Sequence, residues 1–168
     1  MVNDVAIARM QVLEMAERRQ ITVDEVPGFT GLAYVKGRRI VTPPLTGHTA
    51  YLAALHELGH LIAPEGDAAD LLRAEIAAWE WALSSLVIQP TADAATAALR
   101  ALGSYVGAGA ALDPGLAERL RTVLNQMHTI RTNALRDGRL HDPGALDVDG
   151  RLTGRVRRGQ VVADTRWF

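Results

Sequence analysis

The chain has 168 residues, enough for one domain with a hydrophobic core of its own. Its 18 basic and 19 acidic residues nearly cancel, which excludes binding to nucleic acid through a large overall positive charge. There is no cysteine, so any metal must be held by histidine and carboxylate side chains. The chain has neither an apolar run of about eighteen residues nor a secretion-signal layout at its start. We therefore expect a cytoplasmic protein.

The N-terminal third predicts a helix followed by a small β-hairpin. Apolar residues recur at helical spacing over residues 3–19, and residues 21–30 are typical of a connection with one short extended piece. Two β-prone runs near 31–35 and 38–42 flank Gly37, where a glycine would supply the positive φ of a tight turn. The sequence therefore predicts an antiparallel hairpin at this point.

The remainder of the chain up to residue 136 is helical in pattern. Four helices are expected, at residues 48–62, 68–88, 91–106 and 113–136. Asp67 and Asp113 are candidate N-caps, and Pro114 suits the first position of its helix. The C-terminal segment 137–168 is polar, rich in arginine and punctuated by glycines, and we expect it to be a loose hairpin or disordered. The prediction is an α+β fold, with a mostly helical domain over 1–136 and a small antiparallel sheet.

One motif carries most of the functional information. His56-Glu57-Leu58-Gly59-His60 has the form His-Glu-x-x-His and lies inside a predicted helix. Residues four apart share a helix face, so both imidazoles can bind one ion, and zinc accepts neutral imidazole nitrogen. The helix is apolar on several sides and hence buried, where an unsatisfied polar side chain is costly. We expect His56 and His60 to bind Zn²⁺ and Glu57 to act as a general base beside it.

The third ligand is less determined by the sequence. The metzincin arrangement is excluded because its third histidine is absent downstream of the motif. The gluzincin arrangement takes a glutamate from the next helix, where Glu75 and Glu80 are available. Five residues correspond to roughly 140° around a helix, so only one of the two can face the histidines. Glu75 shares its stripe with apolar residues and is preferred over Glu80. Asp67 and Asp70 are weaker candidates.

The residues around the motif resemble a known family. The run from Thr49 to Ile62 is similar to the active-site helix of ImmA/IrrE-type metallopeptidases, many of which occur in phages and mobile elements. The segment beginning at Glu75 is similar to the family's Glu-x-x-Ala-Asn-x-Phe-Ala helix, with Glu75 on the ligand glutamate. Trp79 and Trp81 replace the usual asparagine and phenylalanine. The resemblance covers about residues 31–90, roughly a third of the chain.

This resemblance implies a zincin-like, zinc-dependent endopeptidase that acts on a protein or peptide, in some members a helix-turn-helix repressor. No membrane or nucleic-acid partner is expected. Zinc would activate a bound water, with Glu57 as general base and Glu75 completing the ligand set. An extended substrate would pair with an exposed sheet edge, for which strand 38–42 is the candidate.

An inactive protein is the alternative interpretation. An intact His56-Glu57-His60 set favours a peptidase, since a scaffold has no need of Glu57. The tryptophan at position 79 and the lack of an identified oxyanion donor favour a zincin-fold binding or regulatory module of phage or prophage origin. No spacing argument selects among the possible oxyanion donors, which are Tyr34, Tyr51, Tyr105, His128 and His141.

Overall fold

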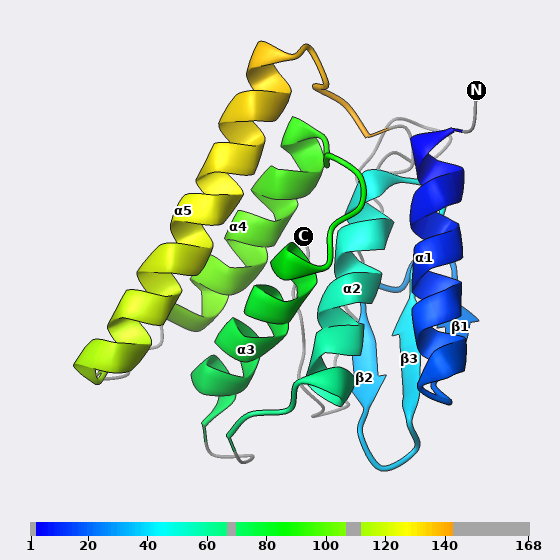
Figure 1. The fold of residues 1–168 in the computed structure, drawn as a ribbon, viewed down its shortest axis with the longest axis horizontal. Coiled ribbons are helices and arrows are strands. Elements are labelled where there is room, and N and C mark those ends of the chain that lie inside the picture. The colour runs from blue at the N-terminus through cyan, green and yellow to red at the C-terminus, as the bar shows by residue number, and fades with distance from the viewer. Residues whose placement is uncertain (1–2, 67–69, 107–111, 143–168) are drawn as a thin grey trace.

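A computed structural model describes residues 3–66, 70–106 and 112–142 (Figure 1). Within these residues the fold is α+β, as predicted, with five helices and one three-stranded sheet. The elements in chain order are α1 (Asp4–Arg18), β1 (Thr22–Glu25), β2 (Leu32–Tyr34), β3 (Arg39–Thr42), α2 (His48–Ile62), α3 (Leu71–Ser84), α4 (Ala92–Val106) and α5 (Pro114–Arg136). Among the described residues, no helix has the length and apolar character needed to cross a bilayer.

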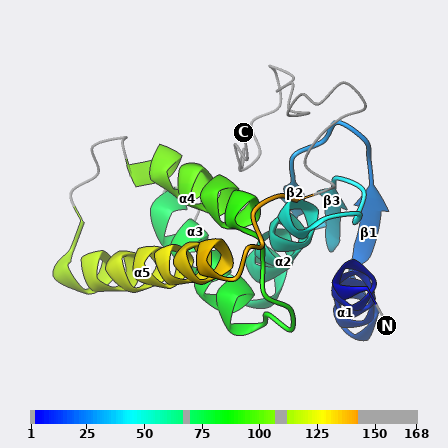
Figure 2. The ribbon, with the colours of Figure 1, turned by 90° about the horizontal axis from the view of Figure 1, so that it is seen from above.

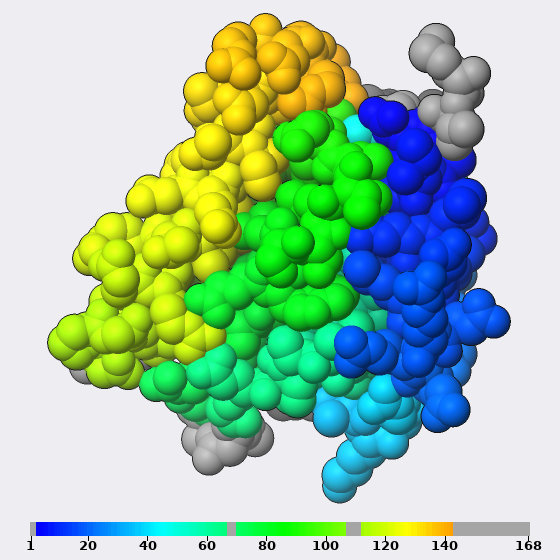
Figure 3. Space-filling view, in the orientation of Figure 1, coloured from blue at the N-terminus to red at the C-terminus, as the bar shows by residue number. Residues whose placement is uncertain are grey.

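Helix α2 is the centre of the molecule. It packs against α1, β2 and β3 on one side and against α3 and α4 on the other (Figure 2). In the space-filling view, α1 and the connection after α3 meet and cover much of α2 from that side (Figure 3). Only His60 and Ile62 of this helix are not buried. The apolar character that the sequence shows on several sides of α2 is explained by these neighbours on every side.

The sheet is mixed, and β3 is its central strand. β3 pairs antiparallel with β2, which confirms the hairpin, and parallel with β1. The short extended piece expected within 21–30 is β1. The prediction that strand 38–42 forms the sheet edge is wrong, because β1 occupies its second side. The turn also differs from expectation, since Arg38 rather than Gly37 adopts the positive φ, at 45°.

The helix ends follow local hydrogen bonding. Asp113 accepts from Leu116 N at 2.9 Å with Pro114 in the first turn, which confirms that cap. Asp70 caps α3 by accepting from Arg73 N, whereas the predicted cap Asp67 lies outside the described residues. Helix α3 ends at Ser84, four residues before the predicted end. Hydroxyl groups of the two serines there compete for backbone acceptors, since each donates to the Trp81 carbonyl at 2.8 Å.

The residues after α5 return to the middle of the fold. The carbonyls of Arg139 and Leu140 accept from the first amides of α4, at 2.9 and 3.2 Å. Asp142, itself 1% exposed, accepts from the backbone N–H groups of His48 and Thr49 at the start of α2. The chain between 137 and 142 therefore caps two helices. Residues 143–168 of the predicted C-terminal segment lie outside the described residues, and the domain division stays a prediction.

Candidate metal centre

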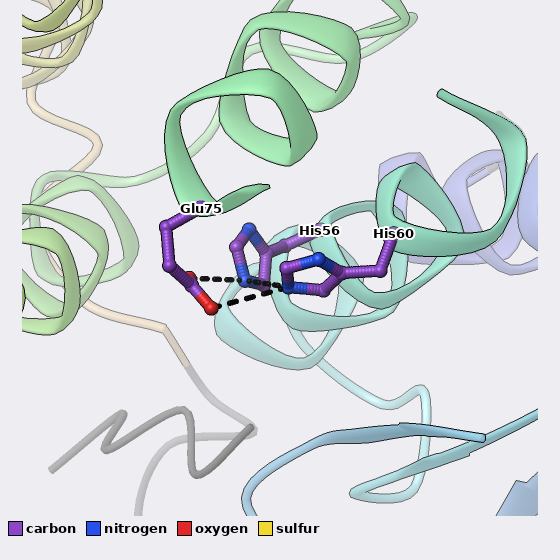
Figure 4. Close-up of side chains that lie close together, drawn as sticks. All are labelled: His56, His60 and Glu75. Carbon is purple, nitrogen blue, oxygen red and sulfur yellow. Dashed lines mark hydrogen bonds and ion pairs between the residues drawn. The ribbon is translucent and has the colours of Figure 1, made fainter. Parts of the chain in front are cut away.

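The two histidines of the motif lie one turn apart on α2 and point the same way (Figure 4). His56 is fully buried, and the His60 side chain is 10% exposed. Their Nε2 atoms are 3.1 Å apart. The helical spacing of four residues is what brings the two ring nitrogens together, as the motif predicts.

Helix α3 brings a carboxylate to the same point. Glu75 is 1% exposed; its Oε2 lies 3.0 Å from His56 Nε2 and its Oε1 lies 3.3 Å from His60 Nε2. Figure 4 shows this side chain reaching from α3 toward both rings. Of the candidate acids that the structure describes, Glu75 is the one that joins the histidine pair. We call His56, His60 and Glu75 the triad.

A close approach of two helices makes this contact possible. A Cβ atom on Gly59 would lie 2.6 Å from the carbonyl oxygen of Ala78 and 2.9 Å from its Cα. Real Cβ atoms do not come so near to backbone, so only glycine fits at this position of α2. Gly59 therefore sets the separation of α2 and α3 within one turn of each triad residue.

The spacing of the triad matches the needs of a small cation. Tetrahedral zinc with ligand distances of about 2.0–2.1 Å places its ligand atoms about 3.3 Å from one another. The two imidazole Nε2 atoms here are 3.1 Å apart, and each lies 3.0 or 3.3 Å from a different oxygen of the Glu75 carboxylate. Among the described residues, this is the group of histidine and carboxylate side chains with metal-binding proximity. The residues present therefore fit a bound metal ion.

Electrostatics around the triad also favour a cation. Burial would raise the pKa of Glu75, but the adjacent imidazoles of His56 and His60 lower it to about 2. Burial would lower the pKa of His60, yet the hydrogen bond to Glu75 and the charges of Glu57 and Glu75 raise it overall. A carboxylate that stays ionised, in a buried site, draws positive charge to the imidazoles.

Glu57 follows His56 on α2 and is fully buried. Its charge contributes to the raised pKa of His60, so this carboxylate lies within electrostatic range of the triad. A buried, ionisable carboxylate beside a metal-binding group is the arrangement that general-base chemistry uses.

Trp79 is a site residue that the sequence interpretation treated only as a substitution for the asparagine of the motif that it resembles. Its indole lies against the His56 imidazole, with ring centroids 4.4 Å apart and the planes inclined by 32°. A usable signal was present, since Trp79 lies four residues after Glu75 and therefore on the same face of α3.

The other acidic candidates lie elsewhere. Glu80 accepts two hydrogen bonds from the Arg119 guanidinium, at 2.9 and 2.6 Å, and Glu65 accepts from the same group. Asp70 pairs with Arg73 at 2.6 Å. Asp67 lies outside the described residues. Arginine therefore neutralises Glu80 and Asp70, whereas the partners of Glu75 among the described residues are the two histidines.

Three of the five oxyanion candidates have partners other than the triad or lie exposed. The Tyr51 hydroxyl accepts from Val87 N at 3.2 Å and donates to Gln11, which ties α2 to α1 and to the connection after α3. The His141 side chain is 82% exposed beside Asp93, and His128 is exposed on α5. For Tyr34 and Tyr105, the role stays a prediction.

Comparisons with protein-family models, with curated proteins and with solved structures find no match. Function must therefore be argued from the site itself. The site consists of two imidazoles and a carboxylate that converge in a buried position and could hold a metal ion.

Proposed function

We propose that the protein is a zinc-dependent peptidase of the gluzincin type, related to the ImmA/IrrE metallopeptidases that its motif resembles. The observation that carries the proposal is the convergence of His56, His60 and Glu75 at 3.0–3.3 Å. Glu57 beside them supports hydrolysis rather than metal storage. A storage or structural site would use the same ligands without a second buried carboxylate.

The donor set favours zinc. Two imidazole nitrogens and one carboxylate oxygen form a borderline set that suits Zn²⁺ better than Mg²⁺ or Ca²⁺, which prefer all-oxygen sites. Three protein ligands on a tetrahedral zinc would leave one position for a water molecule or substrate. Catalytic zinc sites have this open position, whereas structural sites fill it with a fourth side chain.

Zinc in such a site supplies Lewis-acid chemistry, which polarises a carbonyl and acidifies water. The protein supplies the proton transfers. The Glu57 carboxylate accepts a proton from the attacking water and returns it to the amine that leaves. Burial of Glu57 keeps competing solvent away from this carboxylate.

The sheet offers a place for an extended substrate. With β3 in the centre, the edge strands among the described residues are β1 and β2. β2 packs against α2, whereas β1 packs against α1, so β2 is the edge next to the helix that carries the motif. A cleft of about 440 Å³ adjoins this strand and is lined by Ala33, Tyr34, Val35, Lys36, Gly37 and Arg39. Backbone pairing with β2 would hold a peptide chain extended.

One observation supports the alternative, a catalytically inactive binding or regulatory module. His56, Glu57 and Glu75 are at most 1% exposed, and the only partly exposed triad residue is His60. A substrate carbonyl reaches so enclosed a site only if neighbouring groups move. A module that keeps the metal for stability or signalling requires no such opening.

The deciding experiment compares wild type with Glu57→Gln. We expect about one zinc per chain in both proteins, because glutamine retains the shape of a residue outside the triad. Cleavage of an unstructured peptide library, followed by mass spectrometry, should fall by about 10²–10⁴-fold in the variant. Equal cleavage by both proteins would remove Glu57 from the mechanism. Stoichiometric zinc with no cleavage by wild type would establish the regulatory alternative.

A further inference from the structure

We infer that Trp79 is a positioning residue for the metal centre, because its indole sets the plane of the His56 imidazole. The inference rests on the proposed metal-binding function. In many metal sites a polar group outside the ligand set hydrogen-bonds to a histidine ligand and orients its ring. Here a packing contact would orient the ring. The juxtaposition that carries the inference is the 4.4 Å contact between the two rings, both of which are fully buried.

The imidazole of a histidine needs such support. Rotation about the bond that joins the ring to Cβ has broad, shallow minima, so the rotamer alone does not fix where Nε2 points. At His56, Nε2 must face both His60 Nε2 and Glu75 Oε2, at 3.1 and 3.0 Å. A flat ring tilted by 32° against the imidazole at this distance restricts the rotation, because turning the imidazole further would drive its edge into the indole.

Two aromatic neighbours enclose His56 in different ways. Trp79 lies at 32° to the imidazole, whereas His60 presents its edge at 80° with centroids 4.6 Å apart. Stacked and edge-to-face contacts are both favourable arrangements. The His60 side chain is 10% exposed, so the indole acts on the drier of the two histidine ligands.

The position of the indole is itself fixed by the backbone. Ala78, directly before Trp79, contacts α2 at Gly59 with no room for a side chain. Glu75, one turn earlier on α3, supplies the carboxylate of the triad. One face of α3 thus carries both Glu75, the anionic ligand, and Trp79, the indole that orients His56.

The test measures Co²⁺ affinity for wild type, Trp79→Phe and Trp79→Leu, by competition with a chelator and the visible absorption of bound Co²⁺. Phenylalanine keeps an aromatic face, so its affinity should stay within about threefold of wild type. Leucine removes the face, so its affinity should fall by about tenfold, the lower end for loss of an outer-shell partner. Trp81→Leu is the matched control on the same helix and should bind as wild type does, since Trp81 lines a different cleft, beside Glu80.

A second control separates positioning from loss of stability. Leu102→Ala truncates a fully buried side chain on α4, far in sequence from the motif, and should lower the melting temperature without changing Co²⁺ affinity. A readout without metal is the ring-current shift of the His56 ring protons, which should be the same in wild type and Trp81→Leu and much smaller in Trp79→Leu, where the His60 ring alone remains beside it. This shift reports the stacking itself.

The outcomes are distinct. If wild type binds no Co²⁺ or Zn²⁺, the proposed function fails and this inference fails with it. If wild type binds metal and a folded Trp79→Leu binds it equally well, the metal site stands and the positioning role is overturned. If Trp79→Leu and Leu102→Ala weaken binding to the same extent, Trp79 acts through stability alone, which also overturns the inference.

Discussion

Helix α3 carries two glutamates with opposite environments. Glu75 is 1% exposed between two imidazoles, whereas the Glu80 side chain is 35% exposed and accepts a two-point hydrogen bond from Arg119. Arginine is a permanent cation, so the Glu80 side is neutralised at every physiological pH. An imidazole is charged only when protonated, so the two partners that Glu75 has among the described residues carry no permanent positive charge. The comparison indicates why one acid is a structural ion pair and the other a metal-ligand candidate.

The largest effect is expected when the Glu75 carboxylate is removed. Glu75→Ala removes one of three ligand atoms, so zinc affinity should fall by more than the roughly 10–100-fold that loss of an outer-shell partner causes. Glu80→Ala is the matched control, because it removes a carboxylate of the same helix that faces Arg119. Zinc content and affinity, measured on both variants after exposure to the same metal buffer, check the prediction. Loss of zinc from Glu80→Ala alone would reverse the assignment of the third ligand.

The same comparison predicts a ligand-linked stabilisation. With free zinc at about 100 times its dissociation constant, the free energy of unfolding of wild type should rise by about 2.7 kcal/mol. Glu80→Ala should show the same increase and Glu75→Ala almost none. Chemical denaturation with and without a chelator measures it. An increase that persists in Glu75→Ala would place the bound zinc at another site.

Gly59→Ala tests the close approach that brings Glu75 to the histidines. The new methyl group would lie 2.6 Å from the Ala78 carbonyl oxygen, so α2 and α3 must separate. We expect a loss of stability of about 1–3 kcal/mol, typical of overpacking, together with weaker zinc binding. Gly103→Ala on α4 is the control. A Cβ there meets nothing within 4 Å, so the higher helix propensity of alanine should stabilise the protein by up to about 1 kcal/mol.

The sequence predicted the site well where metal-binding side chains are spaced to lie on one face of a helix. The four-residue spacing of His56 and His60 and the apolar stripe around Glu75 were sufficient to predict which side chains meet. The sheet was harder, because β1 is four residues long and its Thr-Val-Asp-Glu pattern has burial on no single face. No local sequence signal indicates that this segment pairs in parallel with β3, which makes β3 the central strand of the sheet.

Contacts between distant segments were the second limit. The role of Gly59 depends on where Ala78 lies, and a glycine inside a helix carries no such information by itself. Asp142 lies 94 residues from the amide of His48 that it caps. In both cases the physical reason for the residue is a partner that only the folded chain brings near.

Asp142→Ala tests whether the start of the motif-bearing helix depends on this distant cap. Gly47, at the N-cap position of α2, has no side chain to accept from the first amides, so the loss leaves two buried N–H groups unsatisfied. We expect a loss of about 1–2 kcal/mol in the free energy of unfolding. Asp142→Asn keeps an acceptor oxygen and should lose less. A thermal denaturation series of the three proteins checks the order, and equal stability of Asp142→Ala and wild type would contradict it.

The smallest effect concerns the arginine side of the comparison. Arg119→Ala removes the partner of Glu65 and Glu80. The three side chains are 30–38% exposed, so solvent screens the pairs and the loss of stability should be at most about 1 kcal/mol. Hydrogen bonds from Arg119 hold the pKa of Glu65 below its usual value, against the effect of burial. Because the carboxyl is more acidic in the folded chain, its contribution is complete above the unfolded pKa of about 4.3 and is lost as the pH falls through the lowered folded value. The stability difference between wild type and Arg119→Ala should therefore shrink below about pH 4 and in high salt.

Zinc affinity should be the same in both proteins at pH 7, since the guanidinium faces Glu80 and not the triad. A change in zinc affinity would show that the two sides of α3 are coupled, and a difference that grows in acid would show that Glu65 is not held by Arg119.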